Sequence, residues 1–303
     1  MAHVSVLLQE AIAGLDIDSG DIFVDATLGS GGHSAAVVDR FGSGVRIIGI
    51  DADADAISRT KENLKGSVAN IIYVQDNFRN LDSILDGLGI KQIDKILFDL
   101  GMSSNQLEES GRGFSFQRNE PLLMTFEKPS EKDQLTAYEI VNYWDEKEIR
   151  EILRLYGEEK YANRIAKAMV SERKISKIGT TGDLVQIILQ SVPKGYKGRI
   201  HPATRTFQAL RIATNDELTA LPEGLDKAFR RLSREGRMAV ISFHSLEDRI
   251  VKNFFRDRVI ARKAVLINNL SAGKAGKPIE ASEEELRANP RSRSAKLRII
   301  EKK

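Results

Sequence analysis

Four short apolar runs in the first hundred residues each end at or next to an aspartate. They have the length and composition of buried strands, and they lie at residues 22–25, 45–50, 71–74 and 94–99. The stretches between them have helical periodicity, at residues 33–41, 53–65 and 78–88. This alternation predicts a parallel sheet with helices on both faces.

The carboxyl ends of parallel strands meet at one edge of such a sheet, where ligands bind in open α/β folds. We therefore expect four carboxylates at this edge, those of Asp25, Asp51, Asp76 and Asp99. A carboxylate at the end of a strand can also cap the helix that follows it. Each aspartate alone is open to either interpretation, whereas four together favour a ligand site.

A glycine-rich turn, Gly29-Ser-Gly-Gly-His33, follows the first strand. Because glycine has no Cβ and tolerates positive φ, such a turn lets the backbone approach a ligand closely. Asp51 follows Gly29 by 22 residues, about where a nucleotide-binding βαβ unit places the carboxylate that binds a ribose. A turn that only packs a helix on the sheet is the alternative.

Two residues argue against a dinucleotide at this turn. The third glycine of the dinucleotide motif would fall at Ser34, and Asp25 would lie where its charge repels a pyrophosphate. A ligand that carries an ammonium or a sulfonium suits that position better. The turn therefore favours S-adenosylmethionine, with a nicotinamide-dependent oxidoreductase as an alternative.

The composition excludes several chemistries. The chain has no cysteine, which rules out disulfides, thiolate metal sites, iron–sulfur clusters and a thiolate nucleophile for methylation at C5 of a pyrimidine. The four histidines are far apart, so no metal site is expected. No apolar run approaches the roughly 20 residues of a membrane span, and the N-terminus lacks the basic cluster of a secretory signal. We expect a cytoplasmic protein without a membrane partner; a homodimer is left open.

The α/β pattern is interrupted in the middle of the chain. Residues 134–191 show four helical faces and no clear strand. A helix at 216–234, a strand at 237–243, a helix at 246–255 and a last strand at 295–300 then resume the α/β pattern. We expect one α/β domain formed by residues 1–107 and 213–303, with a mainly helical insertion at 108–212.

Basic residues are concentrated in a few segments. Residues 256–303 hold 13 Lys and Arg against 6 Asp and Glu, a net charge of +7, whereas the rest of the chain carries −4. This distribution suggests an anionic partner, with nucleic acid first. Three polar segments contain the candidate substrate contacts, which are Arg112, Arg205, Arg211, Arg291 and Arg293. Each segment alone could be a solvated surface.

Asp99 is the candidate catalytic residue. In a doubly wound methyltransferase, the residue at the end of the fourth strand faces both the methyl donor and the acceptor. A carboxylate that accepts an N–H of an amino group localises its lone pair and orients it toward the methyl group. A helix cap is the alternative role for Asp99.

Longer motifs, in order along nearly the whole chain, resemble one family closely, the bacterial RsmH (MraW) family of 16S rRNA methyltransferases. The matching motifs are His3-Val-Ser-Val-Leu-Leu with Glu10, Asp25 to Ser34, Asp99-Leu-Gly-Met-Ser-Ser with Gln106-Leu107, Arg112 to Phe116, His201 to Arg211, Asn215 to Leu218, Ser242 to Arg249 and Asn289 to Ser294.

The resemblance implies a class I methyltransferase sheet, Rossmann-like and doubly wound, interrupted by a helical insertion that helps to recognise the substrate. It implies methylation of N4 of a cytosine in the decoding region of 16S rRNA, near the P site, with S-adenosylmethionine as donor and the small ribosomal subunit as partner. The donor site would then comprise Gly31, Gly32, His33, Asp51, Phe78, Asp99 and Gln106.

One loop departs from the family pattern. After Pro121 the family usually has Leu-Asp-Met-Arg-Met, whereas this chain has Leu-Leu-Met-Thr-Phe, so that an acid and an arginine are missing at Leu123 and Thr125. If this loop contacts cofactor or RNA, those contacts are weakened. A non-catalytic protein that binds S-adenosylmethionine or RNA therefore stays an alternative, and DNA stays an alternative substrate because the cytosine amino group is the same in both polymers.

Overall fold

The chain forms two compact units in the computed structural model, which describes residues 5–127, 134–193, 195–196, 198, 200–267 and 277–303. Residues 1–102 and 218–303 make up the first, here called the sheet unit, and residues 103–217 the second, the helical unit. His3, from the first matching motif, lies outside the described residues. Within the described residues, no helix is long and apolar enough to cross a membrane.

The sheet unit contains a seven-stranded sheet in the order β3-β2-β1-β4-β5-β7-β6. Its strands are β1 Ile22–Asp25, β2 Arg46–Asp51, β3 Asn70–Gln75, β4 Ile93–Asp99, β5 Leu232–Ser242, β6 Ala264–Leu266 and β7 Lys296–Lys302. The first five strands are parallel, and β7 is antiparallel to both of its neighbours. This confirms the doubly wound class I methyltransferase sheet and the four strands expected in the first hundred residues.

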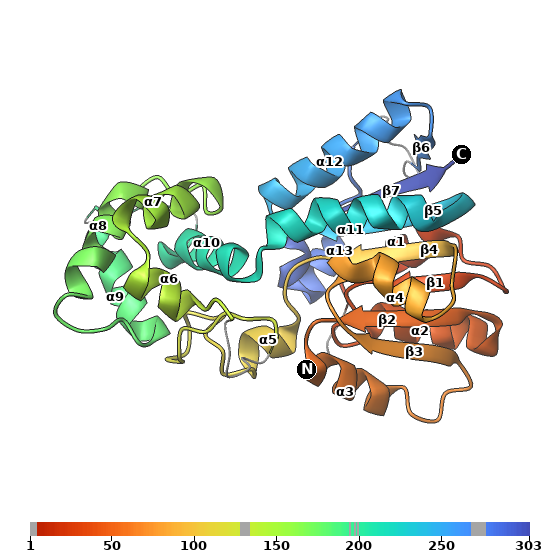
Figure 1. Cartoon of the computed structure of the whole chain (residues 1–303), viewed down its shortest axis with the longest axis horizontal. Helices are drawn as coiled ribbons and strands as arrows, with labels where there is room; N and C mark the ends of the chain where they lie inside the picture. Colours follow the sequence, from red (N-terminus) through yellow and green to blue (C-terminus); the bar gives the residue numbers. More distant parts are fainter. Residues whose placement is uncertain (1–4, 128–133, 194, 197, 199, 268–276) are drawn as a thin grey trace. The chain divides into compact units, whose positions relative to one another are not determined.

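Helices cover both faces of this sheet (Figure 1). One face packs on α4 Leu81–Gly87, α11 Glu217–Arg231 and α12 Ser245–Ile260, which contribute Leu85, Leu225 and Phe255 to its core. The other face packs on α1 Leu8–Leu15 and α2 Gly32–Phe41, through residues such as Leu15 and Val37. The remaining elements of the unit are α3 Ala54–Asn63, α13 Glu283–Ala288 and the 3₁₀ turns η1 Gly42–Gly44, η2 Phe78–Asn80 and η3 Pro290–Ser294.

The helical unit is built from α5 Ser104–Glu108, α6 Ala137–Tyr143, α7 Glu146–Leu155, α8 Ala162–Glu172, α9 Thr181–Ser191 and α10 Ala203–Asn215. Within residues 134–191, α6, α7 and α9 begin with a capping box, in which the side chain at the N-cap and the side chain three residues later each accept a backbone N–H of the other residue. The pairs are Thr136 with Glu139, Asp145 with Glu148 and Thr180 with Asp183. These local signals explain why the helical character of 134–191 was predictable.

The helix expected at 246–255 is α12, which starts one residue earlier than the sequence indicates. Ser245 with Asp248 resembles a capping box in the sequence, but the N-cap of α12 is His244, and Glu247 is its reciprocal partner. The carboxylate of Glu247 accepts the N–H of Phe243 at 2.8 Å. Asp248 instead forms an ion pair with Arg298 at 2.7 Å, which joins α12 to β7. Histidine is an unusual N-cap residue, whereas serine is a common one. The sequence therefore indicated Ser245 as the N-cap and placed the start of the helix one residue too late.

Candidate active site at the carboxyl edge of the sheet

The glycine-rich turn joins β1 to α2 and is held by Asp51. The Asp51 carboxylate accepts the N–H of Gly29 at 2.7 Å and, through its other oxygen, the N–H of Asp53 at 2.8 Å. Burial raises the pKa of Asp51 to about 6. The carboxylate thus ties the turn after β1 to the end of β2, in the position where a ribose hydroxyl would meet it.

Gly31 and Gly32 form a confined stretch of backbone at the start of α2. Gly31 is the N-cap and has φ +76°, which favours glycine over any side chain with a Cβ. A Cβ on Gly31 would lie 2.4 Å from Cγ2 of Thr60, and a Cβ on Gly32 would lie 2.0 Å from Oγ of Ser5. Both glycines are therefore required by the close packing of Thr60 and Ser5 against the start of α2.

Replacing Gly31 by alanine should destabilise the protein and weaken cofactor binding. Thr60 is fully buried and its hydroxyl donates to the Gly29 carbonyl, so it cannot simply move away from the new methyl group. With the positive φ, we expect a loss of about 1–3 kcal/mol of unfolding free energy. Urea denaturation measures this loss of unfolding free energy. Gly66→Ala is the control for backbone strain alone, because Gly66 also has a positive φ but has open space around it. Equal losses in both variants would contradict the steric argument.

Asp99 lies at the end of β4 with one carboxylate oxygen unused. Its backbone N–H donates to Oγ1 of Thr27 at 2.6 Å, which aligns the ends of β1 and β4. Its Oδ2 lies 3.6 Å from Nδ1 of His33, whereas Oδ1 is buried and has no hydrogen-bond partner in the described parts of the chain. Such an orphaned oxygen is costly unless a ligand donates to it.

His33 is held in one tautomer. Its Nε2 lies 3.2 Å from the carbonyl oxygen of Val6, which can only accept, so Nε2 carries the hydrogen. Nδ1 is then the nitrogen that faces Asp99. His33 is buried, and this contact joins α2 to the N-terminal segment as well as to the end of β4.

Asp25 is buried more deeply than its sequence position indicates. It is 1% exposed, and its Oδ2 accepts the hydroxyl of Ser34 at 2.7 Å. Burial raises the pKa of Asp25 to about 6. Burial, together with the negative charges of Asp25 and Glu247, raises the pKa of Asp99 well above its ordinary value. Asp25 therefore acts on a ligand at this edge through its charge and through the placement of α2.

The electrostatics of this edge fit S-adenosylmethionine. Burial is the main cause of the raised pKa values of Asp25, Asp51 and Asp99, and a sulfonium or an ammonium bound beside these carboxylates would stabilise their charged forms. The Oδ1 of Asp99 lacks a donor among the described residues, and the glycine-rich turn follows β1 at the same edge. A pyrophosphate would add negative charge to this cluster, which argues against a dinucleotide.

Two other candidate residues, which follow β3, have partners within the protein. Asp76 accepts the N–H of Asn77 at 2.7 Å and the side-chain amide of Asn80 at 2.8 Å, so it caps the turn after β3. Phe78, expected in the donor site, packs edge-to-face on Phe98 at 5.5 Å and leaves no space for a Cβ on Gly224 of α11. It is half-buried, so the rest of its ring is accessible.

Gln106, the last expected donor residue, belongs to the helical unit. It is 6% exposed, and its side-chain oxygen accepts the N–H of Ser103 in the capping box that begins α5. The structure therefore brings five of the seven expected donor residues to one edge of the sheet unit. Of the other two, Gln106 caps a helix and Phe78 packs on Phe98. The five residues are Gly31, Gly32, His33, Asp51 and Asp99.

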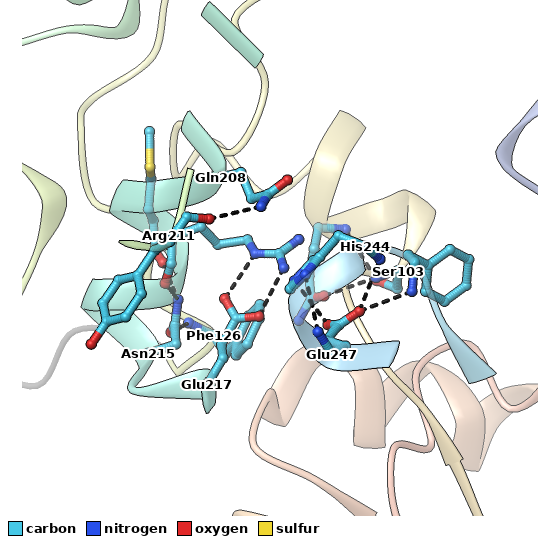
Figure 2. A network of polar contacts seen from close by, with 12 residues as sticks. Ser103, Phe126, Gln208, Arg211, Asn215, Glu217, His244 and Glu247 are labelled. Carbon is cyan, nitrogen blue, oxygen red and sulfur yellow. Dashed lines mark hydrogen bonds and ion pairs between the residues drawn. The ribbon is translucent and has the colours of Figure 1, made fainter. Parts of the chain in front are cut away.

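Most of the candidate substrate arginines are engaged within the protein. Arg112 is 6% exposed and donates to the carbonyl oxygens of Thr125 and Phe126. Arg211 forms a two-pronged ion pair with Glu217, with both N···O distances at 2.8 Å (Figure 2). Both side chains thus organise the helical unit, whatever they contribute to a substrate.

The other three arginines differ in exposure. Arg205 is half-buried and donates to the carbonyl oxygen of Glu158 at 2.6 Å. Arg291 is half-buried in η3, and Arg293, in the same turn, is exposed. Of the five candidates, Arg293 is the one whose side chain the structure leaves most open to a polyanion.

Breaking the Arg211–Glu217 pair should destabilise the helical unit. Both side chains are about 10% exposed, so Arg211→Met leaves a carboxylate in a poorly solvated position, at a cost of about 3 kcal/mol. Arg211→Met combined with Glu217→Leu should recover most of this loss, because the pair is then replaced by apolar side chains. Thermal and urea unfolding measure both. A single variant as stable as the wild type would show that the pair contributes nothing to the fold.

Several contacts of the site were missed from the sequence. Thr27 and Ser34 flank the glycine turn and bind the ends of β4 and β1, and Thr60 on α3 covers Gly31. The carbonyl of Val6 sets the tautomer of His33. Thr27, Ser34 and Val6 stand inside matching motifs, so their position was a signal. Thr60 left no signal, since it meets the turn only after folding.

The loop that departs from the family pattern lies inside the helical unit. Thr125 is fully buried and Leu123 is half-buried. The side-chain amide of Asn215 donates to the Met124 carbonyl at 2.7 Å, and its oxygen accepts the Phe126 N–H at 2.8 Å (Figure 2). The substitutions therefore fall on a packed, hydrogen-bonded segment, and Thr125 offers no surface to a ligand.

Comparison with known proteins places this geometry in a family. The model of the MraW methylase family matches residues 1–303. A relative from Brevibacillus brevis, named ribosomal RNA small subunit methyltransferase H, is 45% identical over 309 residues, which cover 99% of this chain and 98% of the relative. A relative with the same name from Clostridium botulinum strain Kyoto is 43% identical over 312 residues, with the same coverage.

A solved structure shares the fold. It is named PH0851, has a TM-score of 0.50 and 14% sequence identity, and the match covers 100% of this chain and 47% of that one. Sequence similarity along the full length, the sheet order and a site suited to a sulfonium agree with one another. The chain therefore belongs to the MraW methylase family and is an S-adenosylmethionine-dependent methyltransferase.

Proposed function

We propose that this chain methylates the N4 amino group of a cytosine in 16S rRNA, in the decoding region near the P site of the small ribosomal subunit. The observation that carries the proposal is the buried Oδ1 of Asp99, which has no partner at the carboxyl edge of the sheet. The names of the relatives support an rRNA substrate. The absence of cysteine supports direct transfer to nitrogen, since methylation at C5 needs a thiolate. We expect the protein in the cytoplasm, with its substrate.

The chemistry of the transfer assigns the acid–base role to Asp99. When bound, the cofactor supplies an electrophilic methyl group on a sulfonium. Asp99 Oδ1 accepts one N–H of the cytosine amino group, which orients the nitrogen lone pair, and takes the proton that leaves as the new N–C bond forms. A raised pKa makes Asp99 a better base for this step. His33 lies beside this carboxylate, with its Nδ1 3.6 Å from Oδ2 of Asp99.

Labelled methyl transfer tests the proposal. Small ribosomal subunits that lack the modification are incubated with labelled S-adenosylmethionine, and the labelled nucleoside is identified after digestion. We expect label in N4-methylcytidine. Label in a different nucleoside would contradict the proposed atom. Label in a DNA substrate assayed in parallel, with none in the subunits, would contradict RNA as the substrate.

The departure at Leu123 and Thr125 is the one feature that favours a non-catalytic binder. The burial of Thr125 weakens that alternative, because a buried side chain removes no ligand contact from the surface. Binding of cofactor and RNA without transfer of label would support it. Parallel titrations with S-adenosylmethionine and NAD separate both proposals from an oxidoreductase, and the acidic edge predicts binding of the first alone.

A further inference from the structure

Three aromatic rings form a continuous ladder from the core of the helical unit to its surface. Phe207 of α10 is 4% exposed and meets Phe116 edge-to-face, with ring centroids 5.4 Å apart. Phe116 is half-buried and stacks on His201, at 4.6 Å and an interplanar angle of 13°. His201 is exposed. The ladder thus ends in the flat ring of an exposed residue.

His201 is held rigidly although it is exposed. Its Nδ1 accepts the N–H of Ala203 at 3.2 Å, and its carbonyl oxygen accepts the N–H of Thr204 at 3.0 Å, at the start of α10. The contact at Nδ1 places the ring hydrogen on Nε2. Because the ring is already fixed, little conformational entropy is lost when a second ring stacks on it.

The charge around this ladder suits an anionic partner. Among the described residues of 200–205 and 114–118, Arg205 and Arg118 are basic and none is acidic. Arg118 is exposed. Single-stranded RNA is bound by this combination, in which aromatic rings stack on bases and basic residues attract the backbone.

We propose that His201, supported by Phe116 and Phe207, is a stacking platform for an unpaired RNA base. This inference rests on the proposed rRNA substrate and adds the surface of the helical unit that holds it. One base would continue the ladder by lying on the outer side of the His201 ring.

Two substitutions of His201 separate its ring from its capping role. His201→Asn removes the ring but keeps an oxygen that can accept the Ala203 N–H, whereas His201→Phe keeps a flat ring and removes that acceptor. Tyr143→Ala is the matched control, since Tyr143 is another exposed aromatic residue of the helical unit, with 62% exposure, outside the ladder. Thermal unfolding of each variant shows whether it is folded.

The probe is a 12-nucleotide single-stranded RNA that contains 2-aminopurine, whose fluorescence falls when it stacks on a ring. We expect His201→Asn to bind about ten-fold more weakly and to lose the quenching. His201→Phe should stay within about three-fold of wild type and keep the quenching, and Tyr143→Ala should match wild type. In methyl transfer, His201→Asn should raise KM for small subunits and leave kcat unchanged.

The outcomes distinguish the platform from the proposed function. If wild type binds and methylates RNA and His201→Asn does so equally well, the platform is wrong and the function stands. Equal losses in His201→Asn and His201→Phe would also overturn stacking, because the ring would then not be what binds. If wild type neither binds the probe nor methylates small subunits, the proposed function fails, and the platform fails with it.

Discussion

Asp99→Asn should reduce methyl transfer by about 10²- to 10⁴-fold, the usual contribution of a positioned acid–base group. The amide has almost the same size, but it can no longer take up the proton released by the amino group. Cofactor affinity should change by less than about ten-fold, since the glycine-rich turn and Asp51 remain. Single-turnover transfer at saturating cofactor measures the chemical step, and equilibrium titration measures cofactor binding.

Asp21→Asn is the matched control for this substitution. Burial also raises the pKa of Asp21, but Asp21 precedes β1 and therefore lies at the opposite edge of the sheet, 3.7 Å from Lys95. We expect this variant to retain the wild-type rate. If Asp99→Asn kept more than half of the activity, Asp99 would not be the acceptor, and the unused oxygen would need another explanation.

Asp25→Asn should change the pH dependence of stability. The folded carboxyl has a pKa of about 6 because it is buried, whereas in the unfolded chain the value is about 3.9. Below about pH 4 the group is protonated in both states, and the stability that the protonated form confers is fully present. As the pH rises through 6, the buried group ionises and that stability is lost.

The asparagine variant has no such loss at this position. Its unfolding free energy minus that of wild type should therefore rise by about 3 kcal/mol between pH 4 and pH 8, which corresponds to a pKa shift of about 2 units. Urea denaturation at a series of pH values measures this difference, with cofactor absent so that its own charge does not contribute. A constant difference across the series would show that Asp25 titrates as it does in the unfolded chain.

The sheet could be predicted because its signals are local. Each parallel strand is a short apolar run that an aspartate closes, and the alternation with helices dictates that those aspartates share one edge. The capping boxes of α6, α7 and α9 lie within four consecutive residues each, so they too are visible in the sequence. The sequence analysis missed the short elements α1, α13 and β6. They have eight residues or fewer, and such short segments show only weak periodicity.

The roles of the individual carboxylates depended on contacts that form only on folding. Asp76 and Asp51 both follow strands, yet the first caps its own turn and the second binds the turn after another strand. Asp99 differs from both because its Oδ1 has no partner among the residues that the structure describes. Nothing in the sequence around these three residues distinguishes them, since hydrogen-bond partners from other segments decide the outcome.

The arginines show the same division. Their number and their position in polar segments suggest an anionic partner, but they do not indicate which of the arginines are available to it. Arg112 is committed to two carbonyl oxygens 13 and 14 residues away, and Arg211 to a carboxylate that the turn between α10 and α11 brings within 2.8 Å. The sequence by itself determined the order of the strands along the chain, the acidic edge and the family. Only the tertiary structure decided which charges are neutralised inside the protein, because that depends on distances between atoms and not on residue types.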